Sequence, residues 1–514
     1  MFYSIMFPAR ERCENRRQSA VSDCFGDLKL NRIFDAVLSG KKEFELEEFF
    51  FTPLCEPRII TYRQAVMRDL ENTELCTLLT VFSKTVCDIG KYMETVRSSL
   101  TSEDRRLDNY LMRGHMLDYA DRYCGAVSAL LKEISRLAPE SEGFSAFSEY
   151  MSSYGASQDY TELRGHVKRL REEFSKVKYC MLIKNDTIRV RRYEGQKDHS
   201  EQILASFEKF RQGDVKDYRH ELSDSAYAPH VEAAVLDMAA GLYKDVFAEL
   251  KVFCLRYFNF DSETILRFSR EIQFYLSWLD FIAPLRETGL PFCYPRLCRE
   301  AERIYSSEGF DLALAQVERD KTVTNDFALN ASERVIVVTG PNQGGKTTFA
   351  RAFGQIHYLA SLGLCVPGRE AAVCLFDNIL THFGREEDLS ALNGKLRDDL
   401  VRLRAILDQA TKNSVIIVNE IFASTTLSDA LTLGRHMMDK FTALGAVVVT
   451  VTFLDELAMY GQKTVSMMST VREDNPTERT FKVVRKPPDG LAYAIHIAEK
   501  HGLTYKRLCG RIGG

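Results

Sequence analysis

The chain has 514 residues, of which 27% are charged and 45% hydrophobic, the usage of an ordinary globular protein with about two to four domains. Its net charge of −4 excludes a general attraction for nucleic acid, so any such contact must be a local basic patch. The 13 cysteines form no C-x-x-C pair, and residues 1–8 lack the basic start of a secretory signal. We therefore expect reduced thiols and a cytoplasmic protein with no membrane partner, since no run approaches roughly 18 apolar residues.

Residues 1–30 are expected to be an N-terminal extension, and residues 31–300 a mostly helical region. Asp104–Leu137 and His230–Leu285 repeat apolar residues every three or four positions with few glycines or prolines, which predicts amphipathic helices. Within 165–215, two β-rich runs at 179–183 and 187–190 flank an Asn-Asp pair and predict a hairpin.

Basic residues gather around this hairpin, and they have two interpretations. One interpretation is a solvated helix pair with a hairpin tip, and the other is a patch that contacts phosphate backbones. The candidate DNA-binding residues are Lys168, Arg169, Arg171, Lys184, Arg189, Arg191 and Arg192.

The character of the sequence changes after 289–295, a Pro- and Gly-containing stretch that predicts a linker. β-branched runs at 335–339, 415–418 and 446–452 then alternate with helical patterns, which predicts buried strands of a parallel sheet. The expected fold class is therefore α plus α/β, with the helical region followed by an α/β domain over 301–514.

The stretch after the 335–339 run fits G-x-x-x-x-G-K-[ST], the loop that wraps nucleotide phosphates between a strand and a helix. Its glycines let backbone N–H groups turn inward, and the helix that follows adds its positive end. Lys346 is expected to reach the β- and γ-phosphates of ATP, and the Thr347 hydroxyl to bind Mg²⁺. The candidate nucleotide-binding residues are Gly340, Pro341, Asn342, Gln343, Gly344, Gly345, Lys346, Thr347 and Thr348.

The second half of a nucleotide site is predicted at the end of the 415–418 strand. Asn419 is expected to support Mg²⁺, although an amide brings no negative charge, and Glu420 is the candidate catalytic base that orients the attacking water. Before this strand, a helix after Gly394 carries apolar residues at 396, 400, 403 and 407, which predicts one buried face.

Several segments agree in order with the motifs of one family: Asn325-Asp326, Thr339–Thr348, Gly363–Pro367, Asn419–Ile421, Ser424–Thr426 and Ala492–Leu503. Thr339–Thr348 is similar to TGPNMGGKST, and Ala492–Leu503 to S-Y-G-I-H-V-A-x-x-A-G-L. Over about 320–506 the chain thus resembles the MutS family of DNA mismatch-repair ATPases. Residues 51–66 are similar, more weakly, to the start of that family's helical core.

The resemblance implies an ABC-type ATPase domain, a core with lever helices and a reduced clamp at the hairpin. It also implies a homodimer with two shared ATP sites, duplex DNA as ligand and repair proteins as partners. The sequence departs from the family at three places. The stretch before the core is too short for the mismatch-reading and connector domains, Leu396-Arg397 replaces Ser-Thr, and Phe453 replaces the histidine of a Thr-His-Tyr switch.

The sequence therefore favours a MutS-like, DNA-binding ATPase that acts in repair or recombination, with slow hydrolysis. Two alternatives stay open. One is a protein on the same fold that binds branched or damaged DNA instead of mismatches. The other is an ATP-gated scaffold that binds protein and turns over little ATP.

Overall fold

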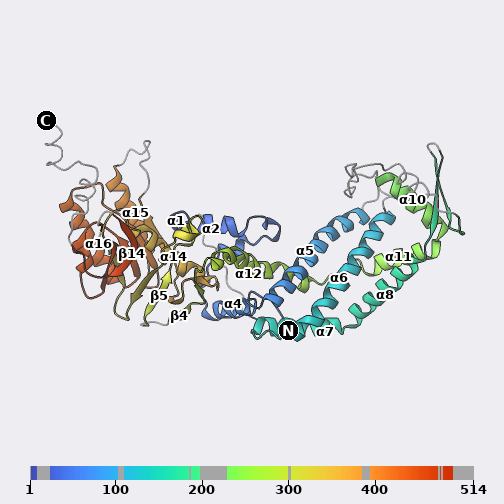
Figure 1. Ribbon diagram of the computed structural model, residues 1–514, viewed down its shortest axis with the longest axis horizontal. Coiled ribbons are helices and arrows are strands. Elements are labelled where there is room, and N and C mark those ends of the chain that lie inside the picture. The colour runs from blue at the N-terminus through green and yellow to red at the C-terminus, as the bar shows by residue number, and fades with distance from the viewer. Residues whose placement is uncertain are drawn as a thin grey trace. The chain divides into compact units, whose positions relative to one another are not determined.

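The computed structural model describes residues 2–8, 23–101, 109–184, 187–196, 229–298, 302–384, 394–472, 475 and 478–489 (Figure 1). Contacts divide the chain into two compact units. Unit one comprises 1–2, 73–139 and 144–270, and unit two comprises 3–72, 140–143 and 271–514. The domain boundary expected near residue 300 stays a prediction, and by contacts the chain divides near residues 72 and 271.

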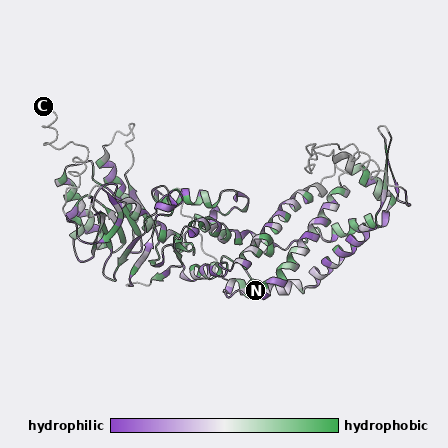
Figure 2. Cartoon of the chain, in the orientation of Figure 1, coloured by the Kyte–Doolittle hydropathy of each residue, from purple (hydrophilic) through white to green (hydrophobic). Residues whose placement is uncertain are grey.

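Unit one is built from long amphipathic helices, which carry both hydrophobic and hydrophilic residues along their length (Figure 2). A serine side chain opens one of them, since Ser157 Oγ accepts a hydrogen bond from the Tyr160 N–H. The helices are α5 (Thr73–Thr101), α6 (Asn109–Leu137), α7 (Glu142–Gly155), α8 (Gln158–Ser175), α10 (Pro229–Leu242), α11 (Lys244–Arg256) and the first part of α12 (Glu263–Glu287). Among the described residues, no helix has the length and apolarity needed to cross a membrane.

The predicted hairpin is confirmed as β1 (Tyr179–Lys184) paired antiparallel with β2 (Thr187–Arg192). Its register separates side chains by chemistry, because paired residues share a face. One face carries Cys180 with Arg191, Leu182 with Arg189, and Lys184 with Thr187. The other face carries Tyr179 with Arg192, and Met181 with Val190. The hairpin is therefore basic on one face and largely apolar on the other.

Unit two contains a six-stranded sheet in the order β10-β11-β12-β7-β13-β14, and all neighbouring pairs are parallel except β13 with β14. The three strands predicted from β-branched runs are confirmed as β7, β11 and β12, which lie at its centre with buried residues on both faces. The strands are β7 (Val335–Thr339), β10 (Ile379–Phe383), β11 (Val415–Asn419), β12 (Val447–Val451), β13 (Thr464–Val471) and β14 (Arg479–Arg485).

Helices pack against the sheet. α14 (Lys346–Ser361) contacts β11 and β12, while α15 (Lys395–Gln409) and α16 (Leu427–Leu444) share a hydrophobic core with β7, β11 and β12. The buried face of α15 differs from the expectation, because Leu400 is 39% exposed and Ile406 is buried in its place. Asp399 turns inward, with its carboxylate 3.2 Å from His382 Nε2.

The stretch at 289–295 is not a linker. Gly289, with φ +86°, ends α12, and the chain then forms β3 (Phe292–Cys293) paired with β8 (Val366–Pro367). A four-stranded sheet follows in the order β4-β9-β5-β6. Its strands are β4 (Arg296–Cys298), β5 (Ile304–Gly309), β6 (Asn325–Leu329) and β9 (Glu370–Cys374). Prolines and glycines here end a helix and begin an edge strand, so their composition alone was misleading.

The N-terminal segment is packed inside unit two. Ile5 and Met6 are fully buried, and Ser4 Oγ donates a 2.8 Å hydrogen bond to the Glu271 carboxylate. Arg63 joins this segment to the end of α14, because it donates to both the Met6 carbonyl and the Leu362 carbonyl at the C-cap of that helix. Further helices of unit two are α1 (Asp23–Asp27), α2 (Leu30–Val37), α3 (Glu47–Phe50), α4 (Pro57–Asp69) and α13 (Leu312–Ala315).

Candidate nucleotide site

The predicted phosphate loop connects β7 to α14 and packs directly on β13. Gly340 has φ +109° and Gly345 φ +89°, conformations that disfavour side chains. A Cβ on Gly340 would lie 2.6 Å from Ser469 Oγ and 2.7 Å from the Ser469 carbonyl oxygen, so no larger residue fits there. The close packing of the loop on β13 therefore fixes the conformation of the loop.

Lys346 begins α14 and turns its side chain back into the loop. Its Nζ donates to the carbonyls of Gly340 at 2.8 Å and Pro341 at 3.2 Å, and to Asn342 Oδ1 at 3.3 Å. The ammonium thus lies within the curve that a phosphate would occupy. Burial lowers its pKa, although the nearby carboxylate of Glu420 acts in the opposite sense.

Thr347 and Asn419 meet at the carboxyl edge of the sheet, although 72 residues separate them. The Thr347 hydroxyl donates a 3.0 Å hydrogen bond to Asn419 Oδ1. A hydroxyl and an amide oxygen are hard ligands that suit Mg²⁺. Within the described ranges, no group of three or more His, Cys, Asp or Glu is placed to hold a metal, so phosphates and water would have to complete the coordination.

Glu420 follows β11 in a left-handed conformation with φ +52°. Its N–H donates to the Val451 carbonyl at 2.9 Å, which holds the residue at the edge of the sheet while its side chain stays exposed. A second carboxylate, Asp455, comes shortly after the neighbouring strand β12. Burial raises the pKa of Asp455, and the positive charge of Lys346 opposes that shift.

A cavity of about 440 Å³ adjoins the loop. Phe481, which has φ +57° and is 48% exposed, lines it together with Gly345 and Asn325. Asn325 fastens this wall, because its side chain donates to the Phe481 carbonyl at 3.2 Å and accepts from the Val483 N–H at 2.7 Å. Phe481 was not predicted from the sequence, because its distinguishing feature, a positive φ, is visible only in the structure.

The structure brings together the predicted loop residues Gly340 to Thr348, Asn419 and Glu420 at one edge of the sheet. Phe453 is 46% exposed just beyond the end of β12, and Leu396 is partly buried against the sheet core. Residues 492–503 lie outside the described residues.

The predicted basic patch is divided. Ion pairs with acidic neighbours engage three residues on α8, namely Lys168, Arg169 and Arg171. Arg192 donates to the Leu242 carbonyl and lies over the Tyr243 ring. Arg189 and Arg191 are exposed and have no ion-pair partner among the described residues, while the Lys184 side chain lies outside them.

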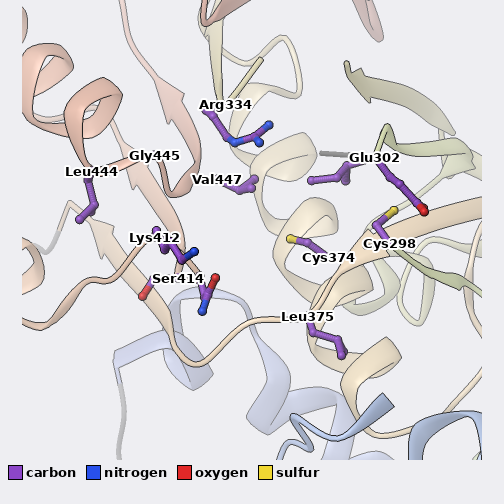
Figure 3. Close-up of a pocket in the computed structure, with 12 residues that line it drawn as sticks. Cys298, Glu302, Arg334, Cys374, Leu375, Lys412, Ser414, Leu444, Gly445 and Val447 are labelled. Atoms are coloured by element: carbon purple, nitrogen blue, oxygen red, sulfur yellow. The ribbon is translucent and has the colours of Figure 1, made fainter. Parts of the chain in front are cut away.

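A second cavity, of about 400 Å³, lies where β7, β11 and β12 begin (Figure 3). Arg334, Lys412, Ser414, Cys298 and Cys374 are among its lining residues. Because these strands are parallel, their amino ends form the edge opposite to the phosphate loop. This cavity is therefore separate from the candidate nucleotide site.

Comparisons with known proteins identify similarity to one family in the region that contains this site. The family described as MutS domain V matches residues 336–507. The DNA mismatch repair protein MutS of Thermotoga neapolitana is 25% identical over 314 residues, which cover 60% of this chain and 36% of that protein. That of Dehalococcoides mccartyi is 28% identical over 315 residues, which cover 59% and 34%. The MutS of Brevibacillus brevis is 27% identical over 213 residues, which cover 40% and 25%.

The matched segments span about a third of the length of the first two relatives, at 36% and 34%. The motif order, the loop packed on β13 and the Thr347–Asn419 contact all fall in or beside the matched region. Residues 336–507 thus match MutS domain V, and the chain is similar to DNA mismatch repair proteins MutS over about 60% of its length.

Proposed function

We propose that this protein is a cytoplasmic, MutS-like ATPase that uses ATP and Mg²⁺ to control its grip on duplex or branched DNA during repair or recombination. It acts as a homodimer and engages repair-protein partners. Unit two holds the nucleotide, and the hairpin of unit one contacts DNA. ATP binding drives the change in grip, and hydrolysis resets it.

The contact between Thr347 and Asn419 carries the ATP part of the proposal. Two oxygen ligands at 3.0 Å, one on the phosphate-loop helix and one on β11, are positioned to share a cation beside the Lys346 ammonium. Glu420 lies at the same edge and is the proposed catalytic base. Phe453 cannot donate or accept a hydrogen bond with its side chain, which supports slow hydrolysis.

Nucleotide binding is tested with Lys346→Ala, which removes the ammonium that would neutralise the phosphates. We expect loss of ATP binding in equilibrium titrations, with Arg404→Ala on the exposed face of α15 as the control. Glu420→Gln should bind ATP and fail to hydrolyse it. Normal turnover by Glu420→Gln would contradict the assignment of the base, and turnover by Lys346→Ala would contradict the site.

The basic face of the hairpin supports the DNA part of the proposal. Arg189 and Arg191 project from the same face of β2. Cations in a row along a two-stranded ribbon can follow a phosphate backbone without reading bases. This interaction releases counterions, so it must weaken as salt rises.

DNA binding is tested with Arg189→Gln/Arg191→Gln across homoduplex, mismatched duplex and four-way junction. We expect weaker binding to every substrate, with the slope of log affinity against log salt reduced by up to about 2. Arg404→Gln in unit two is the control. An unchanged slope would show that the hairpin does not carry DNA, and a preference for the junction would identify branched DNA as the ligand.

One observation favours the scaffold alternative. Met181 and Leu182 are 49% and 51% exposed on the hairpin, and such apolar side chains suit a protein partner. A scaffold would show ATP binding without salt-sensitive DNA affinity. The same titrations therefore discriminate between the two functions.

A further inference from the structure

The carboxyl end of β12 joins the two halves of the candidate nucleotide site, because β12 lies between β11 and β7 in the sheet. On one side the Glu420 N–H donates to the Val451 carbonyl at 2.9 Å. On the other side the Thr452 N–H donates to the Val338 carbonyl at 3.1 Å. Since β7 leads into the phosphate loop, the chain that follows β12 emerges between that loop and the proposed catalytic base.

A turn fixes the position of the first carboxylate after this edge. Thr452 Oγ1 accepts a 3.0 Å hydrogen bond from the Leu454 N–H, and the chain then enters the short 3₁₀ helix η3 (Asp455–Met459). This helix contacts β7 and β13. Leu454 and Leu457 are each only 2% exposed. Buried neighbours before and after it therefore hold Asp455 close to the carboxyl edge of the sheet.

The charge of Lys346 interacts with two carboxylates at this edge. Burial lowers the pKa of Lys346, and the charges of Glu420 and then Asp455 oppose that shift. In turn, burial raises the pKa of Asp455, the charges of Asp489 and Glu456 add to this effect, and the charge of Lys346 opposes it. The ammonium is thus one positive charge among several carboxylates.

Binding of a nucleotide would remove this compensation, because the ammonium of Lys346 is expected at the β- and γ-phosphates. A carboxylate beside a polyphosphate is unfavourable unless a cation lies between them. Asn419, on the neighbouring strand, offers an oxygen but no negative charge to attract such a cation. Asp455 is half-buried whereas Glu420 is exposed, so water and salt screen the charge of Asp455 less.

We propose that Asp455 supplies the negative charge that Asn419 lacks, and that it holds Mg²⁺ on the bound triphosphate through the water of the metal's hydration shell. This inference rests on the proposed ATP site and adds a residue to it. Mg²⁺ keeps several waters in protein sites, so Asp455 can act without replacing Thr347 or a phosphate as a ligand. The negative charge is thereby moved from the end of β11 to the turn after β12.

Equilibrium binding of a non-hydrolysable ATP analogue over a series of Mg²⁺ concentrations tests the inference. Asp455→Asn keeps the shape of the side chain and removes its charge. The Mg²⁺ concentration for half-maximal binding should rise roughly tenfold. With EDTA in place of Mg²⁺, this variant should bind the analogue at least as tightly as the wild type, because a repulsive charge has been removed.

Two further variants serve as controls. Glu456→Gln removes the same charge from the next residue, which is exposed, and should change the Mg²⁺ requirement by less than about twofold. Asn419→Asp/Asp455→Asn returns the charge on the neighbouring strand. Its Mg²⁺ requirement should lie within about threefold of the wild type, which damage to the fold would not allow.

An unchanged Mg²⁺ requirement in Asp455→Asn would overturn the inference. Weaker binding of Asp455→Asn both with Mg²⁺ and with EDTA would also overturn it and assign Asp455 a structural role. An equal shift in Glu456→Gln would attribute the effect to general electrostatics and overturn it too. If the wild type binds no nucleotide, or Lys346→Ala binds normally, the proposed ATP site fails as well. The two failures are thus distinguishable.

Discussion

Asn419 offers a neutral oxygen 3.0 Å from the Thr347 hydroxyl, where a carboxylate would attract a divalent cation more strongly. Asn419→Asp adds this charge without changing the shape of the side chain. We predict that the Mg²⁺ concentration for half-maximal nucleotide binding falls on the order of tenfold. Asn413→Asp, placed just before the other end of β11, should leave the Mg²⁺ titration unchanged. An equal shift in both variants would mean that general electrostatics, and not coordination, is responsible.

Glu420 is the proposed catalytic base, and its backbone is left-handed with φ +52°. This conformation is energetically unfavourable for a residue other than glycine. Glu420→Gly should therefore stabilise unit two by roughly 1 kcal/mol while abolishing hydrolysis. Glu420→Gln should abolish hydrolysis with no gain in stability, because it keeps the Cβ. Denaturant unfolding of the two variants checks the difference. Equal stabilities would show that the surrounding contacts absorb the strain.

At the scale of elements, α14 contains a buried histidine that makes the stability of the fold depend on pH. His357 is fully buried, and its Nδ1 lies 2.9 Å from the Phe353 carbonyl. Burial lowers the pKa of His357 to about 4. The unfolded chain, with a pKa of about 6.5, therefore binds more protons between these values. Stability contributed by the neutral ring is complete above pH 6.5 and falls as the pH drops towards 4.

Between pH 7 and pH 5, we predict that the wild type loses about 2 kcal/mol of stability through His357, an estimate that follows from the pKa difference. The variant His357→Leu should not show this loss. Unfolding free energies measured at several pH values check this. His436→Leu is the matched control, because His436 on α16 makes the same contact to a carbonyl four residues earlier but is exposed. Parallel pH profiles for wild type and His357→Leu would contradict the prediction.

The elements that local patterns specify were predictable. The β-branched run predicted β7, the glycine-rich motif predicted the phosphate loop, and the helical pattern after it predicted α14. Two short β-rich runs around Asn-Asp predicted the hairpin. Phe481 and Asp455 were not predictable, because they reach the site through sheet register and strand order. Leu400 was misassigned because the spacing of apolar residues cannot show that Asp399 is buried beside His382.

At the scale of the molecule, the two units can be followed separately. Trp278 on α12 is the single tryptophan of the chain and is fully buried in unit two. Its fluorescence therefore reports unfolding of unit two, whereas far-ultraviolet circular dichroism also reports the helices of unit one. We predict that saturating nucleotide raises the fluorescence midpoint, because ligand binding stabilises the unit that holds it. An equal shift of the whole dichroism transition would indicate a single cooperative unit.

The buried N-terminal segment sets an order for folding on the ribosome. Ser4 and Glu271 are 267 residues apart in the chain, so Ile5 and Met6 emerge long before the helix that covers them. At about 5–20 residues per second, this delay lasts roughly 15 to 50 seconds. Residues 73–270 are completed in that interval, which lets unit one fold first. During this interval the first segment of unit two stays unfolded, with its apolar side chains exposed. A chaperone that binds such segments would shield it until synthesis passes residue 271.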